Sequence, residues 1–197
     1  MDKSKYYKFN DIVSLIKLGL DNAIYHINGY EENGWQVVRS NQPTIQALQD
    51  KTIYFDIISK RRIGVQGTRP VKTEDGNWAN ESVWYEELLV QVSAFKRRNP
   101  GIDDILTQTS SDIIDLLQAV INADGDLPEG NTDESSKFIR DENFQVIRST
   151  NIRELDYETD SGLKEKMPQF DFLVVVKQRL LKNINKIDTI ELETKRI

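Results

Sequence analysis

Two strand-like runs joined by a long polar stretch constrain the fold of this chain more than any other feature. Residues Thr52–Ile63 and Glu81–Phe95 are rich in β-branched and aromatic side chains, and both alternate apolar with polar positions. Four apolar residues of the first run should share one side of a sheet: Ile53, Phe55, Ile57 and Ile63. The stretch between the runs exceeds the about 12–15 residues at which structureless loops become uncommon. We therefore predict a long antiparallel hairpin whose tip is a flexible loop at about residues 64–80.

Two amphipathic segments lie outside this hairpin. Apolar residues recur at helical spacing over residues 12–27 and again over residues 113–121, which predicts two helices that each bury one face against a sheet. The expected N-terminal caps are short polar residues: Asn10 or Asp11 for the first helix, and Ser110 or Ser111 for the second.

Further strand-like runs complete the pattern. They are Trp35–Ser40, Phe144–Thr150, Phe170–Val176 and Ile187–Leu192. The order predicts an α+β fold, in which a mostly antiparallel sheet with a long β-hairpin is packed by an N-terminal and a mid-chain helix. We expect one domain over residues 1–197, with a second flexible loop in the acidic stretch at about 124–136.

Composition excludes several classes of protein. The 197 residues include no cysteine, which removes disulfides and thiolate chemistry, and one histidine, which leaves no partner for a histidine metal site. The net charge is −6, which argues against a surface specialised for clamping nucleic acid. No apolar run has the length that a bilayer requires, and the N-terminus lacks the pattern of a signal peptide. We expect synthesis in the cytosol and no membrane partner.

The sequence offers little support for catalysis. No glycine-rich phosphate loop precedes a helix, and the adjacent acids Glu86 and Glu87 should point to opposite faces of a strand. The best enzyme alternative is a metal-dependent nuclease that uses Glu193-Thr194-Lys195 with Asp171 or Asp56. That motif occupies the last residues of the chain, where a fixed metal shell is hard to maintain. We therefore predict no catalytic residues, no metal and no cofactor.

The order of these elements resembles the tail-terminator (neck) proteins of tailed bacteriophages. The segments that carry the resemblance are Asn41-Gln42-Pro43, Thr52–Ile63, Trp84–Val92, Ile113–Ile121, Phe144–Thr150 and Phe170–Val176. The resemblance implies a non-enzymatic virion protein of the neck, synthesised in the host cytoplasm. Such a protein forms a ring, commonly a hexamer, that caps the tail tube, ends its elongation and offers a docking face to the head connector. The nearest alternative is a head-completion or adaptor protein of the neck.

The implied partners are further copies of the chain, the tail tube protein, the head connector or neck protein and, in a contractile phage, the tail sheath. DNA would pass through the lumen without specific binding, and the net charge suggests an acidic lumen. Six residues are candidates for the interface: Arg69, Lys72 and Trp78 in the predicted loop, and Phe170, Phe172 and Val174 in the apolar strand. Trp78 is either an anchor for a partner or a side chain folded back onto its own hairpin.

Overall fold

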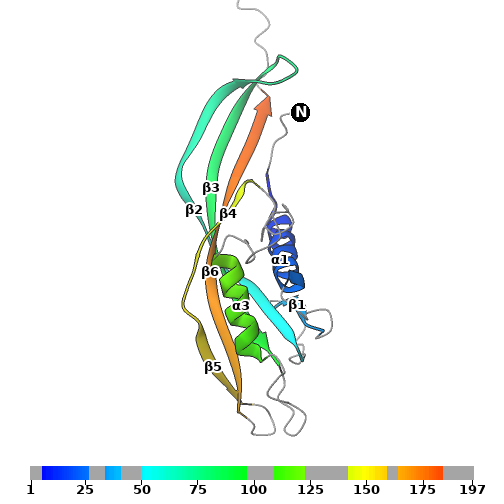
Figure 1. Ribbon diagram of the computed structural model, residues 1–197. Coiled ribbons are helices and arrows are strands. Elements are labelled where there is room, and N and C mark those ends of the chain that lie inside the picture. The colour runs from blue at the N-terminus through cyan, green and yellow to red at the C-terminus, as the bar shows by residue number, and fades with distance from the viewer. Residues whose placement is uncertain are drawn as a thin grey trace, which may run out of the picture.

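A computed structural model describes residues 6–26, 34–40, 50–96, 109–122, 142–158 and 164–183 (Figure 1). The described residues form two helices and one sheet of six strands. In chain order these elements are α1 (Phe9–His26), β1 (Gln36–Arg39), β2 (Thr52–Lys72), β3 (Trp78–Phe95), α3 (Ser110–Asn122), β4 (Phe144–Ser149), β5 (Arg153–Glu158) and β6 (Lys164–Asn183). Neither described helix has the length and apolar content that crossing a bilayer requires.

The sheet is antiparallel at every junction but one. Its strand order is β1-β2-β3-β6-β4, and β5 pairs with the beginning of β6 beside β4. Only β1 and β2 run parallel, with Gln36 opposite Thr52. This arrangement confirms the predicted α+β class with a mostly antiparallel sheet and a long hairpin.

Helices α1 and α3 pack on one face of the lower half of the sheet (Figure 1). Alternate residues of β3 and β6, with Val37 of β1 and Ile53 and Phe55 of β2, supply the sheet's part of the core, because successive strand side chains point to opposite faces. Both helices contribute the apolar stripes that their spacing predicts. Among the fully buried residues are Ile12, Ile16, Leu20 and Ile24 of α1, Ile113, Ile114 and Leu117 of α3, Ile53 of β2, Leu88, Val90, Val92 and Ala94 of β3, and Phe170, Phe172, Val174 and Val176 of β6.

Side-chain hydrogen bonds to backbone amides start both helices slightly before the predicted caps, and only the pair at α3 is a reciprocal capping box. At α3 the Thr109 hydroxyl accepts from the Asp112 amide at 3.2 Å, and the Asp112 carboxylate accepts from the Thr109 amide at 2.8 Å. At α1 the Asp11 carboxylate accepts from the Lys8 amide at 2.9 Å. The prediction of Ser110 or Ser111 as a cap is therefore wrong, because Thr109 already satisfies the first amides and Ser110 lies inside the helix.

Strand β2 is longer and less regular than predicted. A bulge between Ile57 and Ser59 shifts its register against β3, so that Lys60 lies opposite Leu88 and Ile63 lies opposite Tyr85. Since an inserted residue reverses which side chains face the core, Ile63 does not share a side with Ile53 as predicted. Lys60 takes the core side instead.

The later strands follow the prediction in part. Strand β4 matches the predicted run at 144–150, and β6 extends well beyond the predicted run at 170–176 in both directions. The predicted strand at 187–192 and the acidic loop at about 124–136 lie outside the described residues.

Candidate functional site

Three strands continue past the helices and form a projecting ribbon, which we define as residues 60–87 of β2 and β3 with residues 177–183 of β6. Figure 1 shows these strands rising above α1 and α3 to a turn at the top. The pairing extends to the tip: β3 pairs with β2, across one register shift, as far as Lys72 opposite Trp78 and with β6 as far as Ala79 opposite Asn183. The ribbon is therefore an ordered sheet.

The turn at the ribbon's tip is short. Strand β2 ends at Lys72 and β3 begins at Trp78, so only residues 73–77 connect them. The Gly76 amide donates to the Thr73 carbonyl at 2.9 Å, and Gly76 adopts φ = 77°, which favours glycine. The flexible loop predicted at about 64–80 is thus wrong over most of its length. Gly67 and Pro70 are tolerated within an edge strand, and a second register shift between Ile63 and Gly67 absorbs the irregular sequence.

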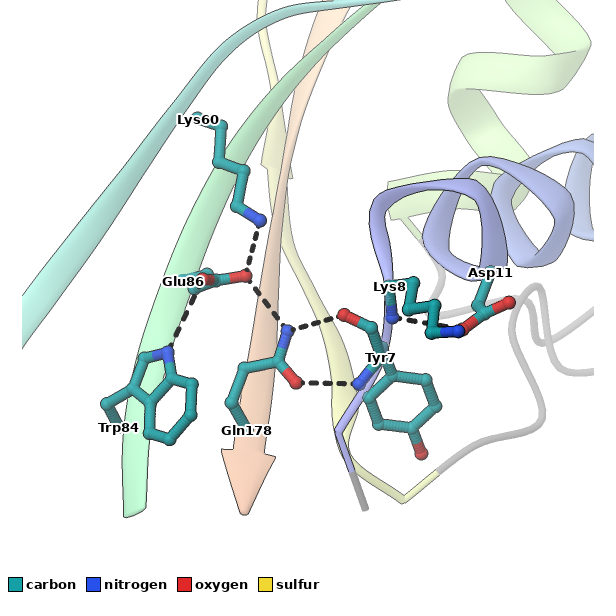
Figure 2. Close-up of polar contacts among 7 residues, drawn as sticks. All are labelled: Tyr7, Lys8, Asp11, Lys60, Trp84, Glu86 and Gln178. Carbon is teal, nitrogen blue, oxygen red and sulfur yellow. Dashed lines mark hydrogen bonds and ion pairs between the residues drawn. The ribbon is translucent and has the colours of Figure 1, made fainter. Parts of the chain in front are cut away.

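A polar network anchors the base of the ribbon to the N-terminal segment (Figure 2). The Gln178 side chain is fully buried and bonds both backbone groups of Tyr7, accepting from the amide at 2.9 Å and donating to the carbonyl at 3.2 Å. It also donates to the Glu86 carboxylate at 2.9 Å. One amide therefore joins β6, β3 and the segment that leads into α1.

Glu86 is the buried acid of this network. Lys60 donates to it at 2.8 Å, and the Trp84 indole donates at 3.3 Å. Burial alone would raise the pKa of Glu86, but the hydrogen bonds from Lys60, Gln178 and Trp84 lower it further than burial raises it. The carboxylate therefore stays ionised, and its pKa lies below the ordinary value.

A second buried acid ties the three strands together farther along the ribbon. Glu81 of β3 is 2% exposed and lies between Arg69 of β2, at 2.7 Å, and Arg179 of β6, which also donates to it. The hydrogen bond from Arg69 does most to lower the pKa of Glu81, burial opposes it, and Arg179 lowers it again. On the same face Arg61 pairs with Glu87 at 2.6 Å.

The ribbon also exposes large apolar side chains. Trp78 is 58% exposed and Leu180 is 44% exposed, and both lie on the ribbon face that continues the helix-covered face of the sheet. Lys72 lies opposite Trp78 and shares its face, whereas Arg69 lies opposite Glu81 on the other face and forms an ion pair with it. Three of the six predicted interface residues therefore lie on this ribbon, two of them on one face, and Trp78 has the exposure that an anchor needs.

The other three predicted interface residues lie elsewhere. Phe170, Phe172 and Val174 are fully buried in the core beneath the helices. Their side chains have no surface to offer a partner in this subunit, because alternation along β6 turns them all toward α1 and α3. A contact through this part of β6 would have to use the opposite face, where Leu173 is partly exposed.

Asp171 and Asp56, the acids of the nuclease alternative that the structure describes, form ion pairs within the sheet. Asp171 accepts from Arg153 at 2.6 Å and from Gln91 at 3.3 Å, and Asp56 lies 3.5 Å from Arg39. Residues 193–195 lie outside the described part of the chain. Within the described ranges, no three acidic, histidine or cysteine side chains gather as metal ligands would.

Comparison with protein families identifies the group to which this architecture belongs. A family model described as the E217 gateway protein gp29 matches residues 11–185. The chain belongs to this family. The predicted resemblance to phage neck proteins is confirmed in part, because this family is a phage gateway family of the head–tail junction. The family is not named as a tail terminator. The gateway match spans α1 from its third residue, all of α3 and the whole ribbon, and the search of curated proteins found no match.

Proposed function

We propose that the chain is a structural component of the phage neck, where copies form a ring that joins head to tail. Membership of the gateway family carries this proposal, because that family is a head–tail one and the match covers both helices and the ribbon. The proposed role is mechanical and needs no bound cofactor.

The architecture suits a ring. A ring requires head-to-tail contacts, so each subunit must present two different surfaces that complement each other. The helix-covered body and the projecting ribbon are two such surfaces. The exposed Trp78 and Leu180 give the ribbon the apolar contact area that interface anchors supply. We propose six copies per ring, as the neck resemblance implies, with the tail tube and the head connector as neighbours.

Disruption of the gene, with complementation from a plasmid, tests the proposal. We expect filled heads and tails of normal length that remain separate, and restored particles on complementation. Tails of uncontrolled length would instead indicate the narrower role of tail termination. Normal infectious particles without the protein would refute a role in joining.

A further inference from the structure

The two edges of the projecting ribbon differ in how well they are protected against pairing with another strand. Beyond Phe55 the outer edge of β2 pairs with no described strand, but it carries Pro70 and two register shifts. Proline and bulges keep a sheet edge from accepting a further strand. The ribbon segment of β6, residues 177–183, contains no proline or glycine and pairs with β3 without a register shift. The ribbon therefore has one protected edge and one regular edge.

The regular edge of β6 is open over a defined length. Below the ribbon β4 covers this edge, and the Lys177 amide still donates to the Asn143 carbonyl at 2.8 Å. From Gln178 to Asn183 the outer side of β6 pairs with no described strand. Such an edge presents a row of amides and carbonyls that can pair with an added strand. The open part of β6 is thus a docking site for an extended segment.

The side chains beside the open edge set the chemistry of the segment that fits it. Leu180 and Lys182 lie on the face that carries Trp78, and Arg179 lies on the opposite face. Lys182 is exposed and makes no ion pair with a described residue. Leu180 is 44% exposed, and Arg179 keeps 24% of its side chain exposed although it binds Glu81. A fitting strand therefore places acids beside Lys182 and Arg179 and an apolar residue beside Leu180.

The chain itself contains a segment with this pattern. Residues 187–192, Ile-Asp-Thr-Ile-Glu-Leu, are predicted as a strand and lie outside the described residues. Antiparallel pairing through a connection at residues 184–186 gives three opposed pairs: Lys182 with Asp188, Leu180 with Ile190, and Arg179 with Glu191. A connection one residue shorter or longer gives none of these pairs. The length of 184–186 falls within the about 2–5 residues that usually join hairpin strands.

We propose that residues 187–192 dock in cis on the open edge of β6 as a fourth, antiparallel strand of the ribbon. The short connection favours the chain's own segment over that of another copy, because it holds the two strands at a high effective concentration. Docking satisfies the outward backbone groups of residues 178–183 and removes an edge on which two ribbons could pair. Ile190 then enlarges the apolar face of Trp78 and Leu180. This docking is a property of the single chain and is independent of the proposed ring.

Disulfide trapping in the purified full chain tests the docking and its register, because the chain has no cysteine of its own. Lys182→Cys with Asp188→Cys puts two thiols at opposed positions. Cα atoms at such positions lie about 4.5–5.5 Å apart, within the range that a disulfide spans. The matched control is Lys182→Cys with Thr189→Cys, since neighbouring residues of a strand point to opposite faces.

Under mild oxidation we expect the pair at 182 and 188 to close within one chain about tenfold faster than the control pair, or more. Equal rates for the two pairs would overturn the proposal, because a segment that does not dock brings either thiol to position 182 equally often. Covalent dimers formed by the pair at 182 and 188 would overturn it too, since the segment would then dock on another copy. Non-reducing gels separate these outcomes.

Hydrogen exchange gives a second readout that needs no cysteine. The amides of residues 178–183 that face away from β3 should be protected in the parent chain, because the added strand accepts from them. Ile190→Pro should raise their exchange rates by about tenfold or more, since proline cannot take part in the interior of a sheet. Lys195→Pro lies beyond the proposed strand and should leave the rates unchanged. Unprotected amides in the parent chain, or equal effects of the two prolines, would overturn the proposal.

Discussion

Replacement of Gln178 by methionine isolates the contact that holds the ribbon's base to the N-terminal segment. Methionine keeps nearly the same length and volume but neither donates nor accepts well. The change removes two hydrogen bonds to the Tyr7 backbone and one to the Glu86 carboxylate. It leaves the apolar packing of the side chain largely in place.

The expected cost follows from those three bonds. A neutral hydrogen bond contributes about 0.5–1.5 kcal/mol net, and one to a charged group about 1.5–3 kcal/mol. Tyr7 is only partly buried, so water can replace part of what its backbone loses. We therefore expect Gln178→Met to lower the free energy of unfolding by about 3 kcal/mol. The loss should divide into a Tyr7 part and a Glu86 part.

Urea unfolding followed by circular dichroism measures this cost, provided that the slope m is unchanged. Gln66→Met is the matched control, because Gln66 lies exposed on the same ribbon and bonds only Arg62 at 3.1 Å. It should cost less than about 0.5 kcal/mol. In a chain that lacks residues 1–7, the cost of Gln178→Met should fall to the Glu86 part alone. A cost equal to that of the control, or one unaffected by the truncation, would refute the reasoning.

Three further predictions concern acid stability, the anchor and the core. The folded-state pKa values of Glu81 and Glu86 lie below the ordinary 4.5. The two ionised carboxylates therefore stabilise the fold fully above that pH, and this stabilisation is lost as pH falls through the folded-state pKa values. Glu81→Gln should reduce the loss of unfolding free energy between about pH 6 and pH 3, measured by urea titration at each pH. Trp78→Ala should change stability by less than about 0.5 kcal/mol but weaken ring formation or partner binding by about 2 kcal/mol or more, measured by analytical ultracentrifugation and plaque complementation. Phe172→Ala should cost about 3–5 kcal/mol of stability in urea, because its ring is fully buried; a stable variant defective only in assembly would contradict its place in the core.

The sequence predicted those parts of the fold that depend on apolar spacing within short segments. The stripes of α1 and α3 and the alternation of Leu88, Val90 and Val92 are properties of short windows, and the structure buries those residues as expected. The class of fold follows from the same windows. The opposite faces of Glu86 and Glu87 follow from strand geometry alone, and their separate partners, Lys60 and Arg61, confirm them.

The ribbon was missed for a physical reason. Residues 64–72 contain Gly64, Gly67 and Pro70, which weaken strand propensity, and their pairing comes from β3. Beyond it lies β6, about a hundred residues away in sequence. The register shift between Ile63 and Gly67 admits both glycines without ending the strand, and no window of sequence shows where a bulge will fall. The position of Ile63 was wrong for the same reason.

The candidate site was only half visible in the sequence. Trp78, with Arg69 and Lys72 in the same polar stretch, could be singled out because aromatic residues dominate interface energetics. Phe170, Phe172 and Val174 were predicted at an interface because they are apolar, but they lie in the core of the subunit. Burial inside a subunit and burial between subunits favour the same residue types, so the sequence could not separate the two. Gln178 carried no signal, since a buried amide is recognised only once its partners are known.

A cryo-EM reconstruction of the neck in intact phage particles tests the central claim most directly. The account predicts a closed ring of this chain between head and tail, with the ribbon of each copy in contact with a neighbouring copy. Absence of the chain from the head–tail junction, or its presence there as isolated copies that form no ring, would contradict the account.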